Sequence, residues 1–356
     1  MAWIPQKEKP YVFRLIAGVL LVTLFFYLLL FYLYIINAPL CPQNSWALVT
    51  LRKGEKIESF LKKMEQNGIK VNPFFFRLYI KLTGHSKDLK AGEYMVSTSQ
   101  SIKSLAQALI KGKTYLRTVT VWEGMDMFDI AHLLVQTGIL SQEKGFINTA
   151  TNPVLLKKLK VPGKSAEGFL FPETYRFPKG FPASRIVETM VNTFWNRIPP
   201  DLKEKKRPEL YKIVILASII QKETSLKEEM PLVSSVYHNR LKRGMRLQAD
   251  PTVIYAIRLK YHKKKTRLSK EDLRINSPYN TYLHKGLPPG PICNPGLDAL
   301  EAAAHPAKTG YLYFVAKGDG SHVFSYTLAE HNRAVARYIR ELKKQREATL
   351  KKKGNP

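Results

Sequence analysis

One glutamate in this 356-residue chain is placed for acid–base chemistry. The pattern over 208–224 predicts a helix whose middle is almost continuously apolar and therefore buried on most sides. At about 100° per residue, Glu223 continues the apolar stripe of Ile213, Leu216 and Ile220. Burying an ionised carboxylate is costly, so we expect its pKa to lie above the usual value of about 4.3. A carboxyl group that holds its proton near neutral pH can act as a general acid.

Three other interpretations of this helix stay open. Glu223 could lie at the wet end of a buried helix, or pair with Arg240 or Arg246. Ser218 and Lys222 are four residues apart, which also fits a Ser-Lys hydrolase. That hypothesis is disfavoured because Ser218 lies inside the apolar stretch without an adjacent glycine of the oxyanion-hole type.

The segments after this helix supply amides, one carboxylate, hydroxyls and aromatic rings, and they are residues 237–241, 244–255, 279–282 and 286–292. A sugar polymer needs such groups, because they bond to hydroxyl and acetamido groups and stack on sugar rings. The candidate substrate-binding residues are Gln248, Asp250, Tyr255, Asn280, Tyr282 and, before a glycine and a run of aromatics, Glu167.

Several of these residues have a structural alternative. The Asp-Pro-Thr context of Asp250 also suits a helix N-cap or a turn. Glu167 either shapes the entrance to the cleft or supports the fold. His305 and His322 lack ligand-like neighbour spacing, so we predict no metal and no cofactor.

Five motifs in one order resemble the endolytic murein transglycosylases, the YceG-like family. They are LASIIQKET at 216–224, RLQADPTVIY at 246–255, YNTY at 279–282, GLPPGPI at 286–292, and AHPA at 304–307 followed by YLYFV at 311–315. The resemblance covers the whole chain after its first residues. It implies cleavage of the bond between N-acetylmuramic acid and N-acetylglucosamine in nascent glycan strands, which leaves 1,6-anhydro ends and terminates elongation.

The resemblance also implies residue roles. The family's catalytic glutamate is the second acid of an acid-Lys-acid triplet, which is Glu223 here, whereas the first position is Gln221 and cannot titrate. We expect Glu223 to protonate the leaving oxygen and then, as a carboxylate, to take the proton of the sugar's own 6-hydroxyl. The muramic N-acetyl group can assist departure, so one carboxylate suffices.

An apolar run near the N-terminus predicts a membrane anchor. Residues 15–36 are 22 uncharged residues, about 33 Å of helix against a bilayer core of about 30 Å. Lys7, Lys9 and Arg14 precede the run and no basic residue follows until Arg52, which predicts a cytoplasmic N-terminus. A cleaved signal peptide is the alternative, but the run is too long and residues 37–39 make a poor cleavage site.

The composition limits the partners. Lys and Arg total 57 against 28 Asp and Glu, a net charge of +29 that attracts polyanions. Export argues against nucleic acid and favours lipid headgroups or the carboxylate-bearing peptides of the wall, although the Lys-rich C-terminal tail also fits a merely solvated surface. Cys41 and Cys293 are the only cysteines, so no disulfide framework is expected.

Residues 46–140 contain a self-match at an offset of 70. Thr50, Gly54, Ile57, Phe60, Met64, Gly68 and Ile69 align with Thr120, Gly124, Met127, Ile130, Leu134, Gly138 and Ile139. Each copy predicts a short strand, a glycine turn, an amphipathic helix and a closing glycine. The pattern loosely resembles LysM-type glycan-binding modules, and the alternative is that the matched positions only mark core and turn.

Together these observations predict an α+β protein with an N-terminal transmembrane helix, a small LysM-like β/α module and a mainly helical catalytic domain with a C-terminal β element. The predicted parts are a cytoplasmic tail (1–14), the membrane helix (15–36), a linker (37–45), the module (46–150), the catalytic domain (151–345) and a basic tail (346–356). Within the catalytic domain we expect a hairpin over 311–326 that turns at 317–320, followed by a helix from 328 to about 347.

The expected location is the bacterial cell (inner) membrane, crossed once, with the catalytic domain outside the cytoplasm. Expected partners are peptidoglycan glycan strands and, from the resemblance, the wall-synthesis polymerases of the same membrane. The alternative function is a non-catalytic, membrane-tethered wall-binding protein.

Overall fold

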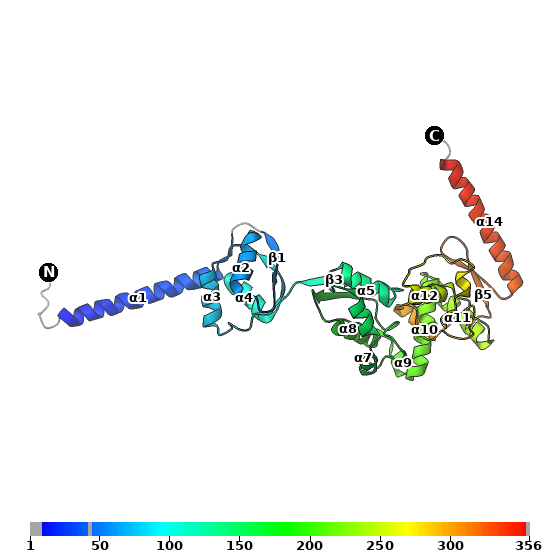
Figure 1. Ribbon diagram of the computed structural model, residues 1–356, viewed down its shortest axis with the longest axis horizontal. Helices are drawn as coiled ribbons and strands as arrows, with labels where there is room; N and C mark the ends of the chain where they lie inside the picture. The colour runs from blue at the N-terminus through cyan, green and yellow to red at the C-terminus, as the bar shows by residue number, and fades with distance from the viewer. Residues whose placement is uncertain (1–8, 42–44, 354–356) are drawn as a thin grey trace. The chain divides into compact units, whose positions relative to one another are not determined.

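The computed structural model describes residues 9–41 and 45–353, with side chains for 11–41 and 45–343. The chain divides into two compact units, Met1–Arg117 and Thr118–Pro356. Helices predominate and the described strands form three two-stranded sheets (Figure 1). The predicted α+β class is therefore confirmed.

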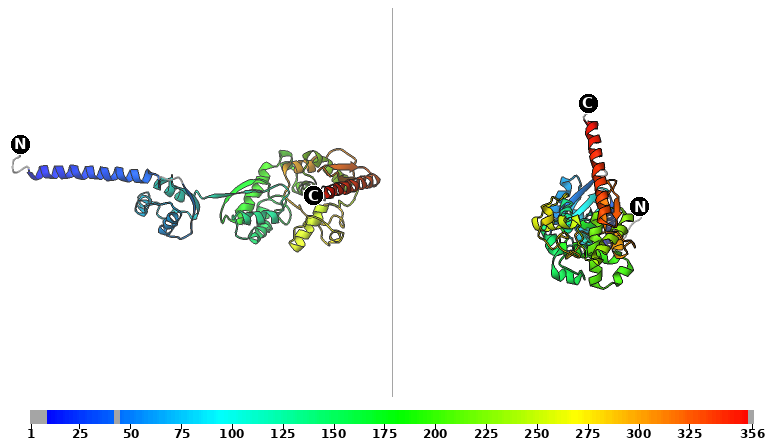
Figure 2. Two further views of the ribbon diagram at one scale, coloured as in Figure 1. Left: turned by 90° about the horizontal axis from the view of Figure 1, so that it is seen from above. Right: turned by 90° about the vertical axis from the view of Figure 1, so that its right-hand side faces the viewer.

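The first unit begins with the predicted apolar helix. α1 (Lys9–Asn37) contains a 27-residue stretch, Tyr11–Asn37, that is long and apolar enough to cross a membrane. It runs as one uninterrupted helix to the folded part of this unit (Figure 2). Its last turns are part of that fold, because Ile36 is buried and Tyr32 and Ile35 pack on the same core.

The remainder of the first unit is a β/α module. Its elements are β1 (Trp46–Leu51), α2 (Ile57–Gln66), α3 (Pro73–Leu82), β2 (Gly92–Ser97) and α4 (Ile102–Lys111). β1 and β2 pair antiparallel, with Leu48 opposite Met95. The sequence sets the helix starts locally, since Asn72 caps α3 and a Ser101–Ser104 capping box begins α4.

The two copies of the sequence repeat adopt the same local structure. α2 and α5 (Met127–Gln136) are each ten residues long, and each is followed by a glycine of positive φ, Gly68 and Gly138. The amide of Ile69 bonds to the Met64 carbonyl at 2.9 Å, and the equivalent bond in the second copy is 3.0 Å. The matched apolar positions are buried except Ile57, which is half-buried against the same core, so they are core positions in both copies.

The two copies nevertheless belong to different units. The second copy packs its apolar residues, including Val121, Ile130 and Leu134, into the core of the larger unit. The structure therefore divides the chain after Arg117, earlier than the module end expected at residue 150. A repeat shows similar local structure, but long-range packing decides which core each copy joins.

The second unit is built around ten helices and two of the small sheets in the described part of the chain. The helices are α5, α6 (Glu143–Ala150), α7 (Pro153–Lys158), α8 (Ala183–Arg197), α9 (Pro200–Glu204), α10 (Arg207–Glu223), α11 (Met230–Lys242), α12 (Asp250–Tyr261), α13 (Leu297–Ala304) and α14 (Leu328–Lys353). β3 (Leu116–Thr120) pairs with β4 (Thr174–Pro178), and β5 (Tyr313–Ala316) pairs with β6 (His322–Ser325). The predicted C-terminal hairpin and the helix after it are confirmed.

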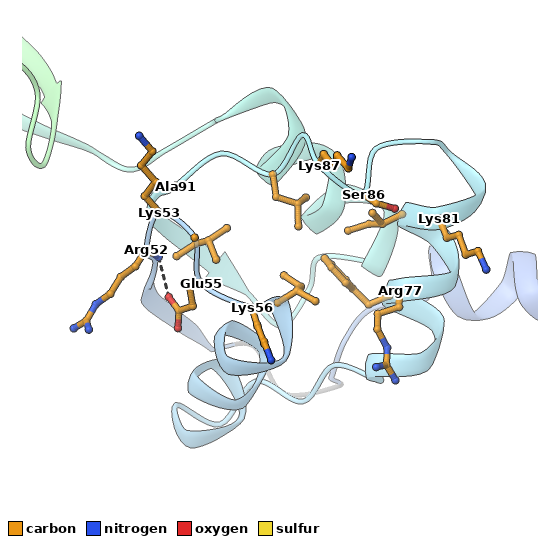
Figure 3. A pocket seen from close by; sticks show the side chains of 15 residues that line it. Arg52, Lys53, Glu55, Lys56, Arg77, Lys81, Ser86, Lys87 and Ala91 are labelled. Carbon is orange, nitrogen blue, oxygen red and sulfur yellow. Dashed lines mark hydrogen bonds between the residues drawn. The ribbon is translucent and has the colours of Figure 1, made fainter.

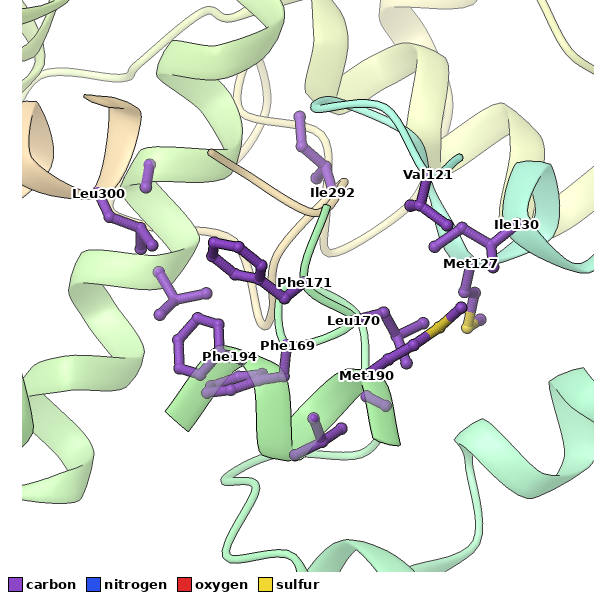
Figure 4. Packing of buried hydrophobic residues seen from close by; sticks show 14 of the residues in the cluster. Val121, Met127, Ile130, Phe169, Leu170, Phe171, Met190, Phe194, Ile292 and Leu300 are labelled. Atoms are coloured by element: carbon purple, nitrogen blue, oxygen red, sulfur yellow. The ribbon is translucent and has the colours of Figure 1, made fainter. Parts of the chain in front are cut away.

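Aromatic residues from the 167–175 segment form the centre of this core (Figure 4). The rings of Phe169 and Phe194 lie 4.7 Å apart, and Leu170 and Met190 pack beside them. Gly168 makes this packing possible, because it has φ +84° and a Cβ there would lie 2.5 Å from Pro291. The segment is thus a core element.

The helix predicted over 208–224 is confirmed as α10. It is buried from Val214 to Ile220 and packs on α11, α12 and α13. Glu223 is its last residue, at the point where the helix leaves the core.

Candidate active site

A pocket of about 330 Å³ lies at the C-terminal end of α10. Its lining comes from the end of α10, from α11, from the start of α12, from the 279–282 segment, from β5 and from α14. The lining residues are Glu223, Tyr237, Arg240, Gln248, Asp250, Tyr282, Tyr313, Phe314, Leu328 and His331. Four of the seven predicted site residues, Glu223, Gln248, Asp250 and Tyr282, are therefore brought together.

Glu223 is half-buried in this pocket and is held by a tyrosine. The Tyr237 hydroxyl donates to Glu223 Oε1 at 2.6 Å. Among the residues described, the second oxygen, Oε2, has no hydrogen-bond partner. Tyr237 itself is buried and packs edge-on against Phe314, with ring centroids 5.9 Å apart. The carboxyl group is thus oriented by one oxygen while the other can meet a ligand.

The surroundings raise the pKa of Glu223 to about 7. Burial among protein atoms is the main cause, and the nearby charge of Asp250 adds to it. The Tyr237 hydrogen bond and the charges of His322 and Arg240 lower the pKa, but by less. At neutral pH, therefore, the group is protonated in a large share of molecules, as a general acid requires.

The second carboxylate of the pocket is Asp250, in the first turn of α12. It is exposed and accepts a hydrogen bond of 2.5 Å from the Tyr282 hydroxyl. Since Tyr282 belongs to the 279–282 segment, this bond ties two of the sequence motifs together at the pocket. Asp250 is not the N-cap of α12, a position that Ala249 occupies.

Gln248 lines the pocket from a backbone conformation that side chains rarely adopt. Its φ is +49°, and its amide donates to the Thr281 carbonyl at 3.2 Å. The neighbouring Ala249 amide donates to Thr281 Oγ1 at 3.0 Å. Such strain persists only where the surroundings hold it, and it is common at ligand sites.

Tyr313 and His331 were not predicted as site residues, and Arg240 was expected only as a partner of Glu223. Arg240 is buried and donates to the carbonyls of Leu312 and Leu247, at 2.7 and 2.6 Å. Its guanidinium lies 5.3 Å from the Tyr313 ring, on which His331 also stacks at 5.3 Å. The sequence signal that could have identified Arg240 is its spacing: it lies three residues after Tyr237, on the same face of one helix.

Glu167 and Tyr255 lie outside the pocket, in a buried polar cluster. Glu167 is fully buried and accepts hydrogen bonds from the Met127 amide at 3.0 Å, Tyr255 Oη at 3.0 Å and Asn294 Nδ2 at 2.9 Å. Burial, and then the charge of Asp126, raise its pKa to about 8. The cluster joins four distant segments, so the structural interpretation of Glu167 replaces the predicted role at the cleft entrance.

Asn280 is fully buried as well. Its Nδ2 donates to the carbonyls of Leu273 and Ile275, and its Oδ1 accepts from the Tyr282 amide at 3.0 Å. A side chain with no exposed surface cannot bond to a sugar, so Asn280 shapes the loop that presents Tyr282. The predicted sugar contacts of Asn280 and Tyr255 are corrected accordingly.

Three other polar residues of α10 have structural partners. Gln221 Oε1 accepts a hydrogen bond of 2.9 Å from the backbone amide of Gly296, at the start of α13. This role needs only an acceptor oxygen, so the side chain does not have to titrate. Ser218 is fully buried and donates to the Ile215 carbonyl at 2.7 Å. Lys222 reaches the Gly124 carbonyl instead, at 3.2 Å, which removes support for a Ser-Lys pair.

The two histidines considered as metal ligands each contact one carboxylate. His305 lies 3.0 Å from Asp201, and His322 lies 2.6 Å from Glu229. In the portion that the structure describes, no three His, Cys, Asp or Glu side chains are grouped to hold a metal ion. Cys41 and Cys293 are free thiols.

Most of this chain is similar to one family of known proteins. The model of the YceG-like family matches residues 49–337. The endolytic murein transglycosylase of Bacillus subtilis (strain 168) is 35% identical over 312 residues, which cover 82% of this chain and 84% of that protein. The protein of the same name from Streptococcus pneumoniae (strain D39) is 29% identical, and the match covers 86% of this chain but 62% of the longer relative.

A solved structure is also similar. The 2.6 Å crystal structure of a YceG-like protein from Listeria monocytogenes superimposes with a TM-score of 0.56 at 31% identity. The match covers 81% of this chain and 98% of that one.

Proposed function

The chain belongs to the YceG-like family, and from that premise we propose that it is a membrane-anchored endolytic peptidoglycan transglycosylase. It cleaves bonds between N-acetylmuramic acid and N-acetylglucosamine in nascent strands, leaves 1,6-anhydro ends and so ends strand elongation. The observation that carries this proposal is Glu223, a carboxyl group with a pKa of about 7 in an open pocket, oriented by Tyr237.

Glu223 acts first as acid and then as base. Its proton passes to the glycosidic oxygen as the bond from that oxygen to the muramic C1 breaks, and the muramic N-acetyl group assists departure. The 6-hydroxyl oxygen then bonds to C1, and the Glu223 carboxylate takes the hydroxyl proton. The proton returns to the glutamate and no water is consumed, so one titrating group completes the cycle.

The other pocket residues position the glycan. Asp250, Tyr282 and Gln248 supply hydrogen-bond partners in the pocket, and Tyr313 supplies a ring. Asp250 has a second effect, since its negative charge favours the protonated form of Glu223. Tyr237 acts through Glu223 and is a positioning residue.

The module of the first unit is proposed to be LysM-like and to contact glycan. On the outward face of its sheet, Trp46, Leu48 and Met95 are exposed, with fractions of 63%, 40% and 38%. An exposed indole suits stacking on a sugar ring. A Trp46→Ala full-length variant should bind purified wall several-fold more weakly in sedimentation, while Leu82→Ala, another exposed apolar residue, should bind as wild type does.

We place the N-terminus in the cytoplasm, and the module and second unit outside it, because Lys7, Lys9 and Arg14 precede the apolar run 15–36 and no basic residue follows it until Arg52. This orientation gives the enzyme access to strands as they are made. Wall-synthesis polymerases in the same membrane are the proposed partners.

The test is product analysis with the full-length protein in detergent. Purified wall is incubated with wild type, with Glu223→Gln, or with a matched control, Glu228→Gln, which changes an exposed glutamate outside the pocket. Wild type and control should release ends lighter by one water than hydrolysed ends, as mass spectrometry can show. Ends of hydrolysed mass would indicate a hydrolase, intact glycan would favour the wall-binding alternative, and activity of Glu223→Gln would refute the assigned acid.

A further inference from the structure

A second cavity, of about 680 Å³, lies in the first unit, away from the residues of the proposed reaction. It is lined by the β1–α2 loop, by α3 and by the segment before β2. Its larger apolar lining residues are Leu51, Ile57, Phe76, Ile80 and Leu89. An apolar hollow of this size on a small module is suited to the apolar part of a ligand.

Six basic side chains form the rim of this cavity, namely Arg52, Lys53, Lys56, Arg77, Lys81 and Lys87. All six are exposed, and within the described chain only Arg77 makes a salt bridge, to Glu58. The one acidic lining residue, Glu55, is already held by Lys63 at 2.6 Å. The rim therefore carries an excess of positive charge.

The directions of these side chains indicate what they bind. In Figure 3, Arg52, Lys53, Lys56, Arg77 and Lys81 spread outward from the rim and do not converge on one point. Converging cations would suit one phosphate, whereas spread cations suit a surface that bears many anions. Residues 46–117 together contain fourteen basic and five acidic residues, a net charge of +9, which strengthens the attraction to such a surface.

The membrane helix holds this cavity near lipid. The rings of Phe31 in α1 and Phe75 in α3 lie 6.1 Å apart, while Phe76, Arg77 and Ile80 of the same helix α3 line the cavity. The cavity is thus about one helix diameter, roughly 10 Å, from the membrane helix. Residues 11–30 alone provide about 30 Å of helix, enough to cross the bilayer core, so residues 31–37 and α3 can lie at headgroup level.

We propose that this rim and cavity bind the anionic phospholipid headgroups of the leaflet from which α1 emerges, with the apolar lining residues contacting glycerol or acyl carbons. Opposite charge, apolar lining residues and the packing of α1 on α3 all favour this occupant over soluble anions. Its role would be to hold the module against the membrane. The inference does not depend on glycan cleavage.

The experiment measures amide hydrogen exchange of the full-length protein in nanodiscs. Neutral phosphatidylcholine discs are compared with discs that also contain phosphatidylglycerol. Because each basic residue near an anionic surface contributes about a fivefold effect, exchange of residues 51–57 and 86–91 should slow at least fivefold with the anionic lipid. In wild type, 1 M salt should abolish this protection, since it reduces the screening length to about 3 Å.

Two triple variants of equal charge separate the cavity from general electrostatics. Lys53→Gln with Lys56→Gln and Lys81→Gln should lose the protection, whereas Lys62→Gln with Lys70→Gln and Lys111→Gln, all exposed and outside the cavity, should keep it. Unchanged exchange of α2 and α4 in neutral discs shows that each variant is folded, and the salt result in wild type does not depend on either variant. Equal loss in both variants, or no effect of the anionic lipid, would overturn the proposal.

Two further arms in neutral discs test other sources of negative charge. Inorganic phosphate that produced the same protection would show a free-anion site, and soluble wall peptides that produced it would show a wall-peptide site. Either result would overturn the assignment to lipid.

Discussion

Two glutamates of the second unit have raised pKa values, and their surroundings differ. Glu223, with a pKa of about 7, lines an open pocket and bonds to one side chain through one oxygen. Glu167, with a pKa of about 8, has no exposed surface and accepts three hydrogen bonds from three other segments. A raised pKa therefore does not by itself identify a catalytic acid, because the group must also be able to reach a substrate.

The difference follows from where each residue lies on its element. Glu223 ends α10, where the helix leaves the core. Glu167 precedes the buried Phe169–Phe171 segment, so it lies inside the core with its chain neighbours. There, Asn294 and Tyr255 donate hydrogen bonds to its carboxyl oxygens. One carboxyl group is thus left available for chemistry while the other joins segments of the fold.

The largest expected effect is the loss of activity in Glu223→Gln. The substitution keeps the shape but removes the proton donor, and a positioned general acid–base group contributes about 10²–10⁴-fold. We expect a decrease in kcat of about 1,000-fold with an unchanged Tm. If Glu167→Gln reduced kcat by the same factor in protein that is equally well folded, the contrast between the two glutamates would be contradicted.

Glu167→Ala should instead reduce stability. It leaves the Met127 amide, the Tyr255 hydroxyl and Asn294 Nδ2 buried without their shared acceptor, at about 1–3 kcal/mol for each unsatisfied group. We expect a loss of at least about 3 kcal/mol in urea unfolding, whereas Glu223→Gln should change the free energy by under about 1 kcal/mol. Equal stability of Glu167→Ala and wild type would contradict the assigned role.

The pH dependence of stability should also reflect Glu167. Its pKa rises from about 4.5 unfolded to about 8 folded, so the native state retains a proton that the unfolded state has released. Stability should therefore fall as the pH rises from about 4.5 towards 8, on the order of 2 kcal/mol between pH 6 and pH 8. Glu167→Gln, which does not titrate, should have a flatter profile in the same unfolding series.

The smallest effects are shifts of the upper pH limit of activity, which reports the loss of the Glu223 proton. Tyr237→Phe removes a hydrogen bond that lowers the pKa of Glu223, so the limit should move above pH 7. Asp250→Asn removes a charge that raises this pKa, so the limit should move below pH 7. Shifts of about one unit, or tenfold in protonation, are expected in kcat/KM profiles. Shifts in the same direction for both variants would exclude the proposed electrostatics.

Much of the architecture was predictable because it depends on local pattern. The apolar run of α1, the stripe that ends at Glu223 and the hairpin turn at 317–320 are set by residues close in sequence. The glycine positions after α2 and α5 were also predictable, since a helix that ends with a left-handed residue favours glycine. These features need no knowledge of distant partners.

Long-range packing decided the rest. The sequence alone determined that Glu223 lies on an apolar stripe and that Glu167, Asn280 and Tyr255 are polar residues in dense motifs. Only the tertiary structure decided that Glu223 faces a pocket, that the other three are enclosed, and that Tyr237, Arg240 and His331 gather around the acid. The physical reason is that periodicity shows which face of an element avoids water, whereas the burial of a polar group depends on partners supplied by distant segments.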